Sequence, residues 1–247
     1  ENKLRASVLA DPAFTRRNTK DNTPCVLHVE MVAGSKVSVD VAAKGGGSEN
    51  KSKFKMMNPS DNIVDWVVEM LPQMGAGWCP PGMLGIGIGG TAEHCVLLAK
   101  QALMEPIDMG PLKARGPKND IEAMRIEIFD KVNALGIGAQ GLGGLSTILD
   151  VKIMDAPCHA AGKPAAMIPN CAATRHAHFT LNGSGPAYLE APKLDEWPKV
   201  DWKPDTAAIG VDLDALTPET VASWKQGDRL LLNGKMLTGR DAAHKRI

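Results

Sequence analysis

Two cysteines lie in segments whose composition suits a metal ligand. Cys79 belongs to the glycine-rich segment 75–82 and is followed by two prolines, while Cys171 follows Pro169 and Asn170. The nearby proline restricts the backbone of each segment, so we expect irregular but conformationally fixed loops. Thiolates are the ligands that iron–sulfur clusters use. The two residues are far apart in the sequence, unlike local C-x-x-C zinc spacings, and a buried structural role stays open for both.

Histidines offer a group that exchanges protons near neutral pH. His159 lies in segment 157–171, which is dense in glycine, alanine and proline and which we predict to be a loop. His176 and His178 alternate within a predicted strand, a pattern typical of one exposed face. His159 is therefore the histidine better placed for proton transfer, with a hydrogen-bonded structural role as the alternative.

Three glycine-rich segments, 45–48, 85–90 and 136–144, favour close approach of the backbone to an anion. Segment 85–90 has the letters G-x-G-x-x-G of a dinucleotide fingerprint. However, Gly85 and Gly87 fall inside a predicted strand rather than after it. Tight turns beside strands explain each glycine-rich segment taken alone equally well.

The composition indicates a globular protein with a balanced surface charge. The 247 residues are 44% hydrophobic, and 28 lysines and arginines equal 28 aspartates and glutamates. Without a basic excess we expect neither a nucleic acid nor an anionic membrane as partner, whereas a small anionic substrate stays open. No apolar run approaches the roughly 18 residues of a transmembrane helix. Five sparse cysteines argue against a disulfide scaffold and for a reducing, cytoplasmic compartment.

Strands and helices are mixed without regular alternation, which predicts an α/β fold of the mixed α+β kind. We predict a hairpin of strands 25–32 and 36–43, a helix starting at Ser60, strand 83–88, helices 92–103 and 119–136, strands 148–154 and 176–181, and a hairpin over 230–237 around Asn233-Gly234. The predicted domains are a catalytic domain over 1–185, a linker rich in proline and tryptophan over 186–228, and the beginning of a C-terminal domain over 229–247. The chain starts with Glu1 rather than methionine, so we expect it to be a fragment.

Several of these segments together resemble one family. In order along the chain they are 44–51 (KGGGSENK), 79–81 (CPP) with 89–91 (GGT), 136–144 (GIGAQGLGG), 170–173 (NCAA), and 232–234 (LNG) with 239–241 (GRD). This order is similar to that in the class I, iron–sulfur-dependent fumarate hydratases and in the related α subunit of L-tartrate dehydratase. The resemblance covers essentially the whole chain. It implies the cluster-binding N-terminal domain of a hydro-lyase, with the start of a C-terminal domain.

The resemblance implies a [4Fe–4S] cluster as cofactor. In the family three cysteines hold the cluster and one iron stays free for substrate. Cys79 and Cys171 match two of these ligands. The third family ligand lies in an upstream segment that is absent from this sequence, and Cys25 lacks the neighbours that would identify it as that ligand.

The resemblance also assigns substrate contacts. His159 matches a catalytic histidine, Arg5 an arginine that binds a substrate carboxylate, and Gly47 a glycine whose backbone contacts substrate. Lys51 belongs to the same loop, together with Ser48 and Asn50. The proton-abstracting residue comes from the C-terminal domain in the family, so we expect this chain alone to be inactive. The implied partners are a small dicarboxylate, fumarate or malate, and a second copy of the chain in a homodimer.

Two other functions remain as alternatives. The same chemistry on another 2-hydroxy acid would make the chain an L-tartrate dehydratase. A different class is a non-catalytic module that binds an anion or nucleotide through its glycine loops without a metal. A brown colour after anaerobic purification would favour the cluster, whereas a colourless preparation with bound nucleotide would favour the module.

Overall fold

The structure is a computed structural model, which describes residues 8–173, 175–189, 191, 193, 195, 199, 201, 203, 205–225 and 228–237. The chain divides into two compact units, Glu1–Leu189 and Glu190–Ile247. In the part of the chain described, no helix has the length and apolar character needed to cross a membrane.

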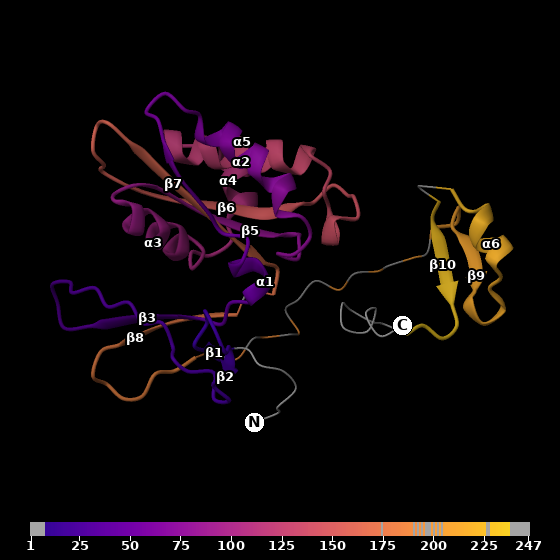
Figure 1. The fold of residues 1–247 in the computed structure, drawn as a ribbon, viewed down its shortest axis with the longest axis horizontal. Coiled ribbons are helices and arrows are strands. Elements are labelled where there is room, and N and C mark those ends of the chain that lie inside the picture. The colour runs from indigo at the N-terminus through magenta and orange to yellow at the C-terminus, as the bar shows by residue number, and fades with distance from the viewer. Residues whose placement is uncertain are drawn as a thin grey trace. The chain divides into compact units, whose positions relative to one another are not determined.

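The first unit contains most of the regular structure (Figure 1). Its strands are β1 Leu9–Ala10, β2 Arg17–Asn18, β3 Val37–Ala42, β4 Lys53–Met57, β5 Gly82–Gly89, β6 Ile148–Ala156, β7 Lys163–Cys171 and β8 His176–Leu181. Its helices are α1 Gly46–Glu49, α2 Ile63–Met74, α3 Ala92–Ala102, α4 Met109–Arg115 and α5 Asp120–Ala134. The second unit contains β9 Ile209–Asp212, α6 Pro218–Ser223 and β10 Leu230–Asn233. This mixture agrees with the predicted fold class.

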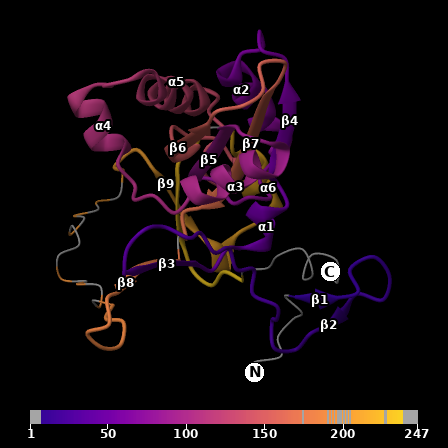
Figure 2. The same ribbon diagram turned by 90° about the vertical axis from the view of Figure 1, so that its left-hand side faces the viewer.

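A four-stranded mixed sheet forms the centre of the first unit. Its strand order is β4-β7-β5-β6, and the four strands lie side by side in this order in Figure 2. β5 runs parallel to β6 and antiparallel to β7, which in turn runs antiparallel to β4. The chain crosses from β5 to the parallel β6 through α3, α4 and α5, as a parallel pair requires.

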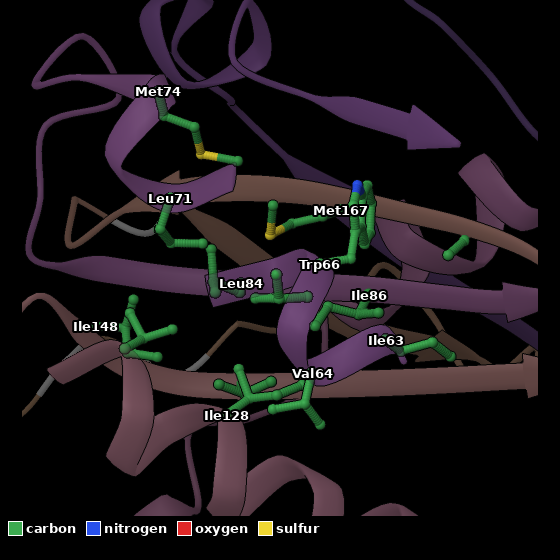
Figure 3. Close-up of a cluster of buried hydrophobic side chains, with 14 of the residues drawn as sticks. Ile63, Val64, Trp66, Leu71, Met74, Leu84, Ile86, Ile128, Ile148 and Met167 are labelled. Atoms are coloured by element: carbon green, nitrogen blue, oxygen red, sulfur yellow. The ribbon is translucent and has the colours of Figure 1, made fainter. Parts of the chain in front are cut away.

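Helices cover both faces of this sheet, so its central strands are buried on both sides. Helices α2, α4 and α5 pack on one face over side chains such as Leu84 and Ile86, which Figure 3 shows inside this cluster. Helix α3 covers the other face, where it contacts Met83 and Ile168. The two faces alternate along β5 with the period of two expected of a strand. This burial explains why Val67 and Met74 of α2 are fully inaccessible to solvent.

Gly85 and Gly87 of β5 let α3 lie directly on the sheet. A Cβ atom at Gly87 would lie 2.0 Å from the carbonyl oxygen of Cys95, and one at Gly85 would lie 2.2 Å from that of Ala99. The space beside both glycines is therefore filled by the backbone of a helix. These two glycines of the G-x-G-x-x-G pattern therefore allow a helix to pack on the sheet. A pyrophosphate has no space beside Gly85 or Gly87.

We expect Gly87→Ala to destabilise the fold by about 1–3 kcal/mol, because the added methyl group must push α3 away from the sheet. Gly110→Ala is the matched control, since no atom lies within 4 Å of a Cβ at that helical position. The control should gain up to about 1 kcal/mol from helix propensity. Urea unfolding measures both values. Equal stability of the two variants would contradict the packing argument.

The predicted hairpin between 25–32 and 36–43 is wrong in its first half. Residues 25–32 form no strand, and their apolar side chains point to solvent, with Met31 91% exposed. The second half is confirmed as β3, which pairs antiparallel with β8 from much later in the chain. An apolar pattern gives a strand only where a partner edge exists, and β3 has one in β8.

The prediction of a loop over 157–171 is also wrong for most of its length. Lys163–Cys171 forms β7, a central strand, and its residues Ala165 and Met167 are completely buried. Pro164 and Pro169 fit because each lies where β7 has a strand neighbour on one side only. The pairing with β5 begins at Ala165, and the pairing with β4 ends at Met167.

The remaining elements agree with the predictions, except for the start of α2 and the hairpin at Asn233-Gly234. Helix α2 is capped by Asn62, whose side chain accepts from the N–H groups of Val64 and Asp65, rather than by the expected Ser60. The predicted hairpin at Asn233-Gly234 is wrong, because β10 pairs in parallel with β9 and residues 234–237 form no strand. The strands at 83–88, 148–154 and 176–181 and the helices at 92–103 and 119–136 are confirmed within a few residues.

Candidate functional site

The candidate site lies at the edge of the main sheet where β5 begins and β7 ends. Gly82, the first residue of β5, pairs with Cys171, the last residue of β7. Cys79 precedes Gly82 by one short turn. The buried ring of Trp78 lies against Gly82, since a Cβ there would be 2.9 Å from the ring. This anchor holds the loop of Cys79 against the sheet edge that carries Cys171.

Cys79 has an unusual backbone conformation. Its φ of 60° lies in the left-handed region, which side chains other than glycine seldom occupy. A turn holds it there, in which the N–H of Cys79 donates to the carbonyl oxygen of Ala76 at 2.9 Å. Such strain concentrates at functional sites, where the surrounding structure enforces it. The thiols of Cys79 and Cys171 both have intermediate exposure, which suits a ligand that must be reached from outside.

Helix α1, which contains Gly47, packs onto the loop of Cys79. A Cβ at Gly47 would lie 2.6 Å from the carbonyl oxygen of Gly77, and one at Gly77 would lie 2.8 Å from Cε of Lys51. Gly47 must be a glycine for this approach, because its neighbour is backbone, whereas the atom beside Gly77 belongs to the flexible side chain of Lys51. The structure therefore brings Gly47 and Lys51 close to the segment of Cys79.

A third glycine-rich loop reaches the same place. The N–H of Gln140, within segment 136–144, donates to the carbonyl oxygen of Pro80 at 2.7 Å. Gly141 lies beside Ala76, whose Cβ would be 3.2 Å from a Cβ at Gly141. Three glycine-rich segments, around residues 45–48, 75–77 and 136–144, thus lie close to Cys79.

The charges beside this edge have a positive excess. Nζ of Lys44 lies 2.9 Å from Oγ of Ser48 and 3.2 Å from a carboxylate oxygen of Glu49, which also binds Lys100 at 2.6 Å. Burial lowers the pKa of Lys44, against the opposing attraction of Glu49 and of Cys171. Two lysines share one carboxylate here, so the local field favours an anionic ligand.

His159 lies at the opposite end of the sheet. It belongs to the turn between β6 and β7, where Ala156 pairs with Gly89, the last residue of β5. Its Nδ1 accepts from the N–H of Ala161 at 3.1 Å, and the side chain is exposed. The eight residues of β5 separate His159 from Cys79 by about 25 Å at roughly 3.3 Å per residue. Arg5, the expected carboxylate ligand, lies outside the described residues.

The donor set at this edge fits an iron–sulfur cluster. Two partly accessible thiols, glycine-lined loops and a positive surrounding charge suit an anionic, thiolate-bound centre. Next to Cys171, the side-chain nitrogen of Asn170 is buried and has no hydrogen-bond partner among the described residues. Within that part of the chain, no group of three or more His, Cys, Asp and Glu side chains converges. The described residues therefore offer two of the three implied thiolates.

The other cysteines have different surroundings. Cys25 and Cys158 are exposed, whereas Cys95 is a completely buried residue of α3. Its Sγ donates to the carbonyl oxygen of Gly87 at 3.2 Å. Burial raises the pKa of the Cys95 thiol from 9.0 to about 11. Cys95 is thus a packing residue that stays protonated at neutral pH.

The raised pKa of Cys95 predicts a stability loss in alkali. The folded state holds the proton more tightly than the unfolded state, so the contribution is complete below pH 9 and disappears as the pH rises to about 11. The loss is at most about 3 kcal/mol, from roughly 1.4 kcal/mol per pKa unit. Urea unfolding between pH 8 and pH 11 measures it. Cys95→Ala removes the thiol and should flatten the slope, and parallel curves would contradict the assignment.

Comparison with known proteins identifies the family to which the chain is related. Residues 1–180 match the family described as Fumarate hydratase (Fumerase). The chain belongs to the fumarate hydratase family. Residues 183–247 match the companion family described as Fumarase C-terminus, so both halves of the chain agree with the resemblance.

Relatives of this fumarate hydratase family member carry two kinds of name. "Fumarate hydratase 2" of Leishmania major is 31% identical over 95% of this chain and 43% of its own length. "Fumarate hydratase class I, aerobic" of Escherichia coli (strain K12) is 30% identical over 93% of this chain and 44% of its own length. "Putative L(+)-tartrate dehydratase subunit alpha" of Methanocaldococcus jannaschii is 40% identical over 66% of this chain and 59% of its own length. The chain thus spans about half the length of the relatives that it matches.

Proposed function

We propose that this chain is the cluster-binding part of a hydro-lyase that reversibly hydrates fumarate to L-malate. The observation that carries the proposal is the single sheet edge at which Cys79, Cys171 and three glycine-rich loops meet. Membership in the fumarate hydratase family supports it. The complete reaction also needs a third thiolate and a proton-abstracting residue, which we assign to other parts of a longer protein.

Each residue of the site has a chemical role in this proposal. The thiolates of Cys79 and Cys171 would hold a [4Fe–4S] cluster, which would supply a Lewis-acidic iron for the substrate hydroxyl. Gly47 presents its backbone N–H to a substrate carboxylate, as the absence of a side chain allows. Lys51 and Lys44 raise the local concentration of a dianion through their positive charge. Arg5 binds the second carboxylate through its paired N–H groups.

Fumarate is favoured over tartrate by the extent of the similarity. The two fumarate hydratase relatives align over 93% and 95% of this chain, whereas the tartrate dehydratase subunit aligns over 66%. The match of 183–247 to a fumarase C-terminal family supports the same choice. L-Tartrate dehydration remains the second candidate, because the subunit with that name has the higher identity over the part that it shares.

The test is a measurement of iron, sulfide and turnover on the full-length protein, prepared without oxygen. We expect about four irons per chain, as a [4Fe–4S] cluster requires, together with hydration of fumarate. Turnover of tartrate alone would transfer the assignment to the second candidate. Protein without iron that binds a nucleotide would contradict the proposal and support the non-catalytic module.

We infer that His159 acts in the site of a second copy of the chain. Its distance from Cys79 along β5 excludes a shared site within one rigid sheet. An exposed turn is well suited to reach a neighbouring molecule, and a homodimer with twofold symmetry would supply two such contacts. In that arrangement the imidazole exchanges protons with the substrate or its leaving water.

Mixed dimers test this inference in the full-length protein. Cys79→Ala and His159→Ala homodimers should both be inactive, because each site lacks one essential group. Co-expression of the two variants should restore activity, since one site of each mixed dimer then has both an intact Cys79 and an intact His159. A mixture as inactive as its parents would place both residues in the same chain's site, and an active His159→Ala homodimer would remove His159 from catalysis.

We also propose that the protein works in a reducing, cytoplasmic compartment. All five cysteines are free, and two of them, Cys25 and Cys158, are exposed. Exposed thiols and a cluster site with partly accessible ligands are both oxidised readily, so we expect activity to require reducing conditions.

A further inference from the structure

The helical turn that contains Gly47 is too short to hold its own shape. Helix α1 consists of the four residues Gly46–Glu49, and its N-cap residue Gly45 makes no side-chain capping hydrogen bond. A single helical turn is unstable in isolation, because its few hydrogen bonds do not offset the conformational freedom that is lost. Contacts from outside the turn must therefore fix its conformation.

Lys44 makes such contacts along one side of the turn. Its Nζ donates to Oγ of Ser48 at 2.9 Å and lies 3.2 Å from a carboxylate oxygen of Glu49, so the side chain spans the turn from its start to its end. Oγ of Ser48 in turn donates to the carbonyl oxygen of Gly45 at 3.0 Å. Ser48 is 3% exposed, and the side chain of Lys44 is 12% exposed. Hydrogen bonds with so little access to water are stronger than those at an open surface.

Other elements hold both ends of this lysine bridge. Directly before Lys44, the N–H of Ala43 donates to the carbonyl oxygen of Arg175 at 3.0 Å, which extends the pairing of β3 with β8. At the other end, both carboxylate oxygens of Glu49 accept from Nζ of Lys100 in α3, at 2.7 and 2.6 Å. The bridge therefore connects the turn to a strand pair on one side and to a packed helix on the other.

We propose that Lys44 is a positioning residue, which holds the turn so that the N–H of Gly47 meets a carboxylate of the substrate. The inference deepens the proposed function and rests on it, because this contact belongs to the proposed site. Lys44 itself does not bind the carboxylate, since its ammonium group is already shared between Ser48 and Glu49. On its other side, Gly47 lies against the carbonyl oxygen of Gly77, so the turn is held from two directions. A donor that is fixed before the substrate arrives binds it at a lower cost of ordering.

The test measures fumarate hydration by Lys44→Met and Ser48→Ala in the full-length protein, prepared without oxygen. Methionine keeps an unbranched side chain but removes the ammonium group. Lys44→Met should raise KM about 10–100-fold, because the Gly47 contact is misplaced. Its kcat should change less than about threefold, since substrate and transition state make this contact equally. Ser48→Ala changes no charge and should also raise KM, and the double variant should be no worse than Lys44→Met.

Lys55→Met is the matched control. Lys55 is a lysine of the neighbouring β4, about half exposed, whose Nζ lies 3.8 Å from a carboxylate oxygen of Asp61. Its KM should equal that of wild type, and all variants should keep the wild-type iron content. A raised KM in Lys44→Met with an unchanged KM in Ser48→Ala would show that Lys44 acts through its charge alone and would overturn the inference. An unchanged KM in both would also overturn it and leave the proposed function intact, whereas wild-type protein without iron and turnover would overturn both.

Discussion

Cys79→Ala should abolish iron retention in the full-length protein, the largest effect expected of any single change in this chain. Cys79 is one of two thiols at the sheet edge. Its loop is held by the packing of the Trp78 ring against Gly82 and by the hydrogen bond from the N–H of Gln140 to the carbonyl oxygen of Pro80. Cys95 cannot take its place, because it is a buried residue of α3 that faces Gly87 of the sheet. Iron and acid-labile sulfide per chain, measured after anaerobic reconstitution, should fall to the background.

Cys25→Ala is the control for this experiment, because Cys25 is an exposed thiol in a segment without regular structure. It should keep its full iron content. A second variant, Cys79→Gly, separates ligation from folding. With a φ of 60° at this position, glycine should be about 1 kcal/mol more stable than alanine, yet equally free of iron. Equal iron content in Cys79→Ala and Cys25→Ala would exclude Cys79 as a ligand.

Asp150→Asn should cause the largest loss of folding stability. Asp150 is completely buried on β6, and its carboxylate accepts from the backbone N–H groups of Asp108 at 2.8 Å and Val151 at 2.6 Å. It also lies 3.2 Å from Nη2 of Arg125 and 3.3 Å from Nζ of Lys152. Both cations bind Asp108 as well. Although burial raises the pKa of Asp108, hydrogen bonds from the two cations lower it overall.

This network joins α4, α5 and β6, so the change affects the packing of the whole crossover. Removing one carboxylate leaves two buried cations with a single, partly exposed partner, and such a break costs about 3–5 kcal/mol. The free energy of unfolding in urea measures the effect. Asp130→Asn removes the exposed partner of Lys113 instead and should cost no more than about 1 kcal/mol. Similar losses for Asp150→Asn and Asp130→Asn would show that the buried network adds no stability.

Local patterns predicted the elements that depend mainly on their own residues. The apolar spacing of α2, the run of β5 and the end of α5 before Gly136 are visible in the sequence and present in the structure. Asn119 caps α5 by accepting from the N–H of Glu122, as expected of a helix start. These signals succeed because a helix or a buried strand needs one apolar face, and that face repeats at short range.

Elements that depend on distant partners were predicted poorly. Segment 25–32 is as apolar as a strand, yet only β3 has a partner strand, which is β8. β7 was read as a loop because of its prolines and alanines, although small residues suit a strand between two helical layers. Its prolines became compatible with a strand only through the stagger of β4 and β5, which no local pattern contains.

The sequence by itself determined the family and the residues that could hold a metal. The order of the motifs placed the chain among the fumarate hydratases, and the same resemblance predicts Cys79 and Cys171 as ligands. Tertiary structure decided which of these residues meet. The antiparallel register of β5 and β7 brings Cys171 to Gly82 and so to Cys79, while the same register sends His159 to the far end of the sheet. Strand pairing sets such distances, because residues far apart in sequence become neighbours only through the register between strands.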